Sequence, residues 1–257
     1  MLLYLRDKQH LKSITEAEGN LAAIAWAYEG RRLSELADVA AMVNTNRAGT
    51  REGVELKPAT IKQRLALLKA ACRWGWKKHS LCESDPTTRM QLPTVRNERH
   101  VYATRQQMLQ LARAADRHDV RVLIRVAFYS GMRLSEVCRA QVQGGAFFLA
   151  DTKNATSRAV PIHPKLSTCL KHLPITTPKS TLERAWQRAR SACGLGHIHF
   201  HDLRHSSASE MINADVDLYT VGQVLGHKDP RSTQRYSHLT HEKLAAAVGR
   251  IGSKRTV

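Results

Sequence analysis

The sequence has no long apolar run and no paired cysteines. None of its apolar stretches approaches the roughly 20 residues that span a bilayer. The first ten residues, MLLYLRDKQH, turn charged too soon for a signal peptide. The five cysteines are widely spaced and include no C-x-x-C pair, which argues against a disulfide framework or a structural zinc site. We therefore expect a soluble protein of a reducing, intracellular compartment with no membrane partner.

Motifs for nucleotides and metals are also missing. There is no G-x-x-x-x-G-K-[ST] phosphate loop, and the carboxylates form no obvious two-metal cluster. The alternating histidines of GHIHFHD would share one face of a strand and could be read as metal ligands. We favour another role for the last of them, His201, and the sequence predicts neither a metal nor any other cofactor.

Acidic residues are scarce relative to basic ones. The 257 residues include 40 Lys and Arg but only 22 Asp and Glu, which gives a formal net charge of +18. Such an excess far exceeds what solubility requires and favours a polyanionic partner such as nucleic acid. Ribosomal proteins are equally basic, so charge alone does not indicate an enzyme.

The first third of the chain shows helical periodicity. Apolar residues recur at the i, i+4, i+7, i+11 spacing of one helix face, at Ile61, Leu65, Leu68 and Cys72. This helix is expected to start near Pro58. Its basic residues off that face include Lys62, Lys69 and Arg73. These three residues either form a solvated helix face or contact DNA phosphates, and the sequence supports the two roles about equally.

A segment without a clear period, Asp85–His100, separates this helical part from the rest and contains two prolines. The sequence predicts a helical domain over residues 1–86, a linker over 87–100 and a second domain over 101–257. In the second domain, TRQQMLQLARAAD predicts a helix capped by Thr104, and VRVLIRVAFYSG a buried helix ended by Gly131.

The remaining pattern is helical apart from one hairpin. A helix is expected from Leu134, and AFFLA and RAVPI indicate two short strands around a polar turn. Helices resume with TLERAWQRARSACG. The expected fold is mainly α with a small antiparallel β-sheet.

Several residues of the second domain suit attack on a phosphodiester. Arg133 and Arg204 offer planar forks of donors that match the non-bridging phosphate oxygens, and Glu136, three residues after Arg133, can orient its guanidinium. A helix beginning near Phe200 would point His201 and Arg204 toward one site. His227 follows Gly226 at an expected helix end. Histidine titrates near neutrality and can move protons.

Tyr236 is the candidate nucleophile, because it lies in the polar stretch RSTQRYSH shortly after His227. Its competitors in the same half include Tyr102, Tyr129 and Tyr219. Tyr129 and Tyr219 are interpreted as packing residues.

The runs SGMRLSE, DTKN, HDLRH, LGH and TQRYSH occur in this order, and with them the chain resembles a tyrosine recombinase of the phage integrase type. The resemblance implies a helical core-binding domain and an α+β catalytic domain that close around a duplex. It implies that Tyr236 forms a 3′-phosphotyrosyl link, and that Lys153 in the hairpin protonates the leaving 5′ hydroxyl. The catalytic set is then Arg133, Lys153, His201, Arg204, His227 and Tyr236, with Glu136 as an accessory.

The same resemblance implies site-specific recombination without ATP or metal, for integration or excision of a phage or mobile element. The partners would be double-stranded attachment sites, bound by a homotetramer, with room for an accessory DNA-bending protein. The protein would act in the cytoplasm of a bacterial cell, at the nucleoid. By the same resemblance the chain would begin directly in the core-binding helices, and the arm-binding domain that the family often has would be either absent by nature or cut away.

Three other functions remain open from the sequence. A type IB topoisomerase shares the tyrosine chemistry, although the LGH run favours a recombinase. A DNA-binding regulator with a dead catalytic fold is less well supported, because all six catalytic positions are filled. A carboxylate-metal transposase is the least well supported. The tail HEKLAAAVGRI has a short apolar stripe at helical spacing. This stripe would dock either on its own domain or on a neighbouring protomer.

Overall fold

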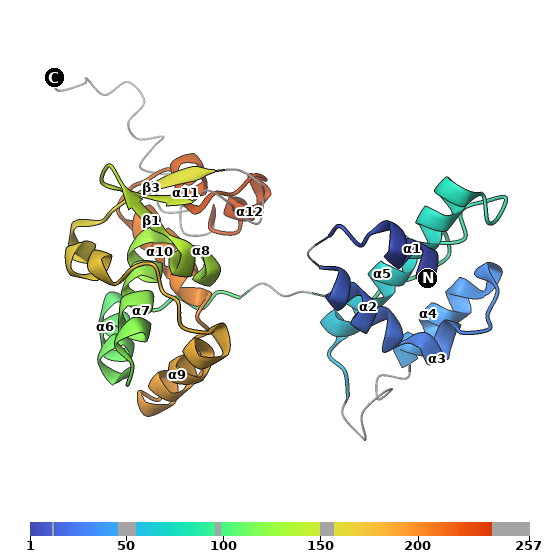
Figure 1. The fold of residues 1–257 in the computed structure, drawn as a ribbon, viewed down its shortest axis with the longest axis horizontal. Coiled ribbons are helices and arrows are strands. Elements are labelled where there is room, and N and C mark those ends of the chain that lie inside the picture. The colour runs from blue at the N-terminus through green and yellow to red at the C-terminus, as the bar shows by residue number, and fades with distance from the viewer. Residues whose placement is uncertain (12, 46–54, 96–98, 150–156, 238–257) are drawn as a thin grey trace. The chain divides into compact units, whose positions relative to one another are not determined.

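The computed structural model describes residues 1–11, 13–45, 55–95, 99–149 and 157–237 (Figure 1). The chain divides into two compact units, Met1–Glu98 and Arg99–Val257. The fold is mainly helical with one small antiparallel sheet, which confirms the predicted fold class. Within the described residues, no helix is both long enough and apolar enough to cross a membrane.

The first unit consists of short helices around one long one. Its elements are α1 (Leu2–Asp7), α2 (Ile14–Ala22), α3 (Ala25–Tyr28), the 3-10 helix η1 (Leu33–Glu35), α4 (Leu36–Thr45) and α5 (Pro58–His79). Helix α5 begins at Pro58 as predicted, because the fixed φ of proline suits a first turn and its missing N–H is not needed there. The four apolar residues named for this helix are all buried.

The second unit carries the sheet and most of the helices. Its elements are α6 (Arg105–Ala114), α7 (His118–Ser130), α8 (Leu134–Arg139), β1 (Gln141–Gln143), β2 (Ala146–Leu149), β3 (Arg158–Pro161), η2 (Pro164–His172), α9 (Lys179–Ala192), α10 (Asp202–Asn213), α11 (Leu218–Leu225) and α12 (Arg231–Gln234). Helix α7 packs against α6, α10 and η2, and Figure 1 shows α6 and α7 side by side.

Local signals explain where the helices of this unit begin and end. The Thr104 hydroxyl accepts the N–H of Gln107, and the Gln107 side chain accepts the N–H of Thr104, which caps α6 as predicted. Gly131 ends α7 with φ +65 and Gly226 ends α11 with φ +68, a left-handed backbone that glycine adopts without strain. Both endings were predicted.

The sheet has three antiparallel strands in the order β1-β2-β3, where the sequence predicted two. Phe147 of β2 pairs with Val160 of β3, and both side chains are buried. Strand β1 was missed because its three residues, QVQ, are all exposed and too few to establish an alternating pattern. Residues 150–156, between β2 and β3, lie outside the described residues, and so does the predicted proton donor Lys153.

Helix α10 is buried although most of its residues are polar. Its first turn and centre include Asp202, Arg204, His205 and Ser206, all buried. The Ser206 hydroxyl accepts the N–H of Ala103 at 2.7 Å and donates to the Asp202 carbonyl at 2.7 Å. Buried polar groups need hydrogen-bond partners, which ordinary apolar core packing does not provide. The polar residues of α10 therefore indicate a functional site.

Candidate active site

Arg204 holds the ends of two helices together. Its Nη1 donates to the Gly131 carbonyl at the end of α7, and its Nη2 to the Leu225 carbonyl at the end of α11, both at 2.7 Å. Arg204 as a whole is only 3% exposed. Burial, followed by repulsion from Arg133 and Arg158, lowers its pKa to about 9. Carbonyls at helix C-termini carry partial negative charge, so they are suitable acceptors for a buried cation.

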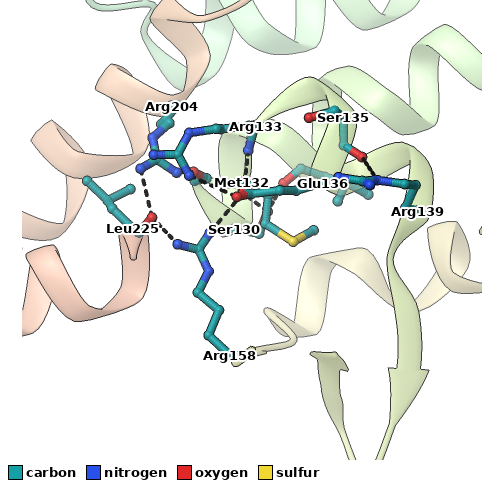
Figure 2. Close-up of polar contacts among 11 residues, drawn as sticks. Ser130, Met132, Arg133, Ser135, Glu136, Arg139, Arg158, Arg204 and Leu225 are labelled. Atoms are coloured by element: carbon teal, nitrogen blue, oxygen red, sulfur yellow. Dashed lines mark hydrogen bonds and ion pairs between the residues drawn. The ribbon is translucent and has the colours of Figure 1, made fainter. Parts of the chain in front are cut away.

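Glu136 bridges two further arginines (Figure 2). Its Oε1 accepts Nη1 of Arg133 at 2.8 Å, and its Oε2 accepts the backbone N–H of Arg133 and Nη2 of Arg158, each at 2.9 Å. Burial alone would raise the pKa of this carboxyl, but the Arg133 N–H and the two guanidinium groups lower it. Glu136 therefore stays ionised and fixes both side chains, as predicted for Arg133.

Arg158 is a residue of this cluster that the sequence analysis missed. It lies at the start of β3, and besides Glu136 it donates through Nη1 to the Leu225 carbonyl that Arg204 also uses. Gly226 permits this approach, since a Cβ there would overlap the Arg158 guanidinium. The only signal in the sequence was an arginine opening the predicted second strand. Two guanidinium groups thus bind one carboxylate, and the third, that of Arg204, shares the Leu225 carbonyl with Arg158. The excess positive charge of this cluster suits a phosphate.

Two histidines predicted for the site lie near these arginines. His201 precedes α10, its side chain is exposed, and its ring packs edge-on against His205 with centroids 4.9 Å apart. Local desolvation, Arg204 and Arg133 lower the pKa of His201. The same three causes lower the pKa of His227 to about 4. Both imidazoles are therefore neutral at pH 7.

His227 is positioned by the helix that follows it. Its Nδ1 lies 2.7 Å from Oγ1 of Thr233 in α12. Gly222 lets α12 approach α11 this closely, because a Cβ there would lie 2.9 Å from the same Thr233 oxygen. With Thr233 donating to Nδ1, Nε2 carries the proton and is left to donate to a ligand.

Tyr236 is buried rather than open to solvent. Its side chain is 1% exposed and packs with residues of α10 and α11, including Ala208, Val221 and Leu225. Its hydroxyl lies 2.5 Å from Nδ1 of His205. Burial raises the pKa of Tyr236 to about 12, although Arg235 and Arg204 oppose the rise. Its polar sequence context did not indicate this burial.

The competing tyrosines differ in their surroundings. Tyr129 is half-buried and accepts Nε of Arg105 at 3.1 Å, which fits the packing role predicted for it. Tyr219 is 76% exposed, so its interpretation as a packing residue was wrong. It lies in the first turn of α11, two residues after the N-cap Asp217, on a side that faces solvent.

The predicted DNA-contact residues belong to the first unit. On α5, Lys62 and Arg73 are exposed and Lys69 is half-buried. Arg73 pairs through Nε with Asp85 at 3.2 Å.

No metal centre is evident among the described residues. In that part of the chain, no three His, Cys, Asp or Glu side chains gather as metal ligands.

Comparison with known proteins places these features in a family context. Residues 174–243 match the model of the phage integrase family. A shufflon-specific DNA recombinase of Escherichia coli is 24% identical over 213 residues, which cover 77% of this chain and 56% of the relative. The tyrosine recombinase XerC of Pseudomonas fluorescens is 30% identical over 200 residues, covering 65% of this chain and 66% of XerC. The chain thus spans between half and two thirds of these relatives.

Solved structures share the fold at low sequence identity. A lambda integrase (75-356) dimer bound to a COC′ core site matches with a TM-score of 0.68 and 21% identity, over 88% of each chain. XerH bound to a palindromic difH substrate matches with a TM-score of 0.63 and 17% identity, over 88% of this chain and 74% of XerH. A lambda integrase tetramer bound to a Holliday junction matches with a TM-score of 0.66 and 21% identity, over 88% and 76%.

Proposed function

Because the chain belongs to the phage integrase family of tyrosine recombinases, we propose that it is a site-specific DNA recombinase that cuts and rejoins DNA through Tyr236. The observation that carries this proposal is the cluster of Arg133, Arg158 and Arg204 around Glu136 and the Leu225 carbonyl. Fixed guanidinium donors are what a transition state with charge on non-bridging phosphate oxygens requires.

In the reaction we propose, the Tyr236 oxygen forms a bond to phosphorus while the bond from phosphorus to the 5′ oxygen breaks. The phenolic proton passes to a neutral imidazole, for which His201 is the candidate. The departing 5′ oxygen takes a proton from Lys153. His227 donates through Nε2 to a non-bridging oxygen, and Arg133 and Arg204 bind the same phosphate. The 5′ hydroxyl of a partner duplex then attacks the phosphotyrosyl link, so no ATP or metal is consumed.

The experiment that tests this function uses nicked duplexes carrying candidate attachment sites from the DNA that surrounds the gene. A nick beside the scissile phosphate lets the short 5′ product diffuse away, so the covalent adduct accumulates. We expect an adduct that resists denaturing electrophoresis and forms in excess EDTA without nucleotide. Tyr236→Phe should bind the same DNA and form no adduct. Cleavage that stops in EDTA and returns with Mg²⁺ would contradict the proposed chemistry.

The first unit is proposed to clamp the duplex, with Lys62, Lys69 and Arg73 on phosphates. The logarithm of DNA affinity falls with the logarithm of salt concentration, and removing one contact between a basic side chain and a phosphate makes that slope shallower by about 0.9. Lys62→Gln and Lys69→Gln together should therefore flatten the slope by about 2, measured by fluorescence anisotropy. Lys78→Gln is the matched control, since the ammonium of Lys78 is already paired with Asp7 at 2.6 Å. Equal slopes in all variants would make α5 a solvated face.

The wider role is also part of the proposal. We propose that the protein acts on attachment sites of a phage or mobile element, as a homotetramer on DNA, at the bacterial nucleoid and with an accessory DNA-bending protein. The tetrameric lambda integrase complex, with which this chain shares its fold, supports the assembly. Analytical ultracentrifugation with two cognate duplexes should give four protomers per pair of sites, and one protomer per site would contradict it.

A further inference from the structure

A histidine outside the predicted catalytic set contacts the candidate nucleophile. His205 lies one helical turn after His201 on α10, and its side chain is 7% exposed. Its Nδ1 lies 2.5 Å from the Tyr236 hydroxyl, which is itself buried. The contact joins two groups that are 31 residues apart in the sequence.

The direction of this hydrogen bond follows from the two acidities. Burial, followed by His201 and Arg235, lowers the pKa of His205 to about 4, whereas the pKa of Tyr236 is about 12. The imidazole is therefore neutral at pH 7 and the phenol keeps its proton. The proton cannot move to His205 in this arrangement, because the phenol is by far the weaker acid. Nδ1 accepts and the Tyr236 hydroxyl donates.

The same contact keeps the phenol away from DNA. A side chain that is 1% exposed leaves no room for a phosphate at its oxygen. The apolar residues around the ring, among them Ile212 and Leu225, are themselves fully buried. Attack therefore requires that Tyr236 leave its position beside His205, and the hydrogen bond opposes that movement.

We propose that His205 is a positioning residue. It holds Tyr236 protonated and buried until DNA binding moves Tyr236 into the arginine cluster. This inference rests on the proposed function, because it assumes that Tyr236 is the nucleophile. It assigns to the second histidine of HDLRH a role distinct from that of His201. Storage would prevent adventitious attack while the protein is not assembled on its site.

The first test needs no DNA. Tetranitromethane nitrates tyrosines whose phenols reach solvent as phenolate, and peptide mass spectrometry reads each tyrosine separately. In the wild type we expect Tyr236 to be protected and Tyr219, which is 76% exposed, to react. His205→Gln and His205→Phe both remove the acceptor at the Nδ1 position. Each should raise the nitration rate of Tyr236 roughly tenfold or more, since the buried hydroxyl loses its partner.

His205→Asn is the matched control, because its amide oxygen can occupy the place of Nδ1 and should restore protection. Tyr219 serves as the internal reference and should react equally in all variants. If His205→Phe fails to fold, as judged by circular dichroism, the comparison of Gln with Asn carries the test. Equal protection of Tyr236 in the wild type and the Gln variant would overturn the storage role.

The second test measures adduct formation on the nicked duplex that the wild type cleaves. His205→Gln should form the adduct faster than the wild type, because less free energy is needed to release Tyr236. A general loss of structure cannot produce a faster reaction. Slower adduct formation by the Gln variant would overturn the proposal. If the wild type itself forms no adduct on any duplex, the proposed function fails, while the nitration result still decides whether His205 holds Tyr236.

Discussion

Replacing Glu136 with glutamine tests whether the arginine cluster depends on a buried charge. Glu136 is 3% exposed and accepts three hydrogen bonds, two from Arg133 and one from Arg158. Glutamine keeps the shape but removes the charge, and it turns one acceptor oxygen into an NH₂ donor. In either orientation of the amide, that NH₂ faces at least one arginine N–H.

The expected cost follows from burial. Breaking a buried ion pair by changing one partner typically destabilises by about 3–5 kcal/mol. Arg133 and Arg158 are 27% and 14% exposed in their side chains and recover some solvation, so we take about 3 kcal/mol, the lower end of that range. For a domain of about 150–250 residues, each kcal/mol shifts Tm by about 2–4 °C, which gives about 6–12 °C here. Cleavage should fall as well, since Arg133 loses its orientation.

Differential scanning calorimetry measures the stability change, and single-turnover adduct formation measures the activity. The matched control is Glu183→Gln on α9, whose carboxylate is 52% exposed and meets Lys179 at 3.4 Å. That change should cost at most about 0.5 kcal/mol. A Glu136→Gln protein with the Tm and cleavage rate of the control would refute the claim that this carboxylate fixes the cluster.

Three further predictions concern the surroundings of the cluster. Arg204→Lys should slow cleavage on the order of 100-fold or more in single-turnover assays, because one ammonium cannot reach both the α7 and α11 carbonyls; near wild-type cleavage would count against this geometry. Gly131→Ala should destabilise by about 2–4 kcal/mol, since its φ is +65 and a Cβ would lie 2.5 Å from Leu225. Gly144→Ala is the control, because Gly144 has φ +55 and a Cβ there would meet open space. It should cost only the backbone strain of about 1–2 kcal/mol in urea unfolding, and an equal loss of unfolding free energy in both variants would contradict the packing argument. The pKa of His205 in the folded protein is about 4, below its ordinary 6.5. Between these pH values the unfolded chain therefore binds more protons than the folded protein. The free energy of unfolding should fall as pH drops from 6.5 toward 4, by up to about 3 kcal/mol. His205→Asn should flatten that part of the urea-unfolding pH profile, and an unchanged profile would show that His205 does not cause it.

Local signals in the sequence predicted much of the fold. Thr104, Pro58, Gly131 and Gly226 each mark a helix boundary, because each serves a backbone need that few other residues meet there. The sequence of LAAIAWAYEG predicts a single helix ended by Gly30, whereas the structure divides it, with α2 ending at Ala22 and α3 beginning at Ala25. Propensity alone does not place such a break, since it depends on packing against other helices.

The site was predictable where residues are close in the sequence. Glu136 meets Arg133 three residues away on one helix turn, which spacing alone indicates. Arg158 and His205 were missed because their partners are distant: Arg158 reaches Glu136 across 22 residues, and His205 reaches Tyr236 across 31. No periodicity reports contacts of that kind. The burial of Tyr236 depends on α10 and α11 packing together, which its polar neighbours do not reveal.

The most direct test of the central claim is the identity of the residue that becomes bonded to DNA. The adduct formed on a nicked duplex in EDTA can be digested with protease and nuclease and read by tandem mass spectrometry. We predict a nucleotide phosphate on the Tyr236 oxygen, in the peptide that contains RSTQRYSH. A nucleotide on Tyr102, Tyr129 or Tyr219, or on any other residue, would contradict it.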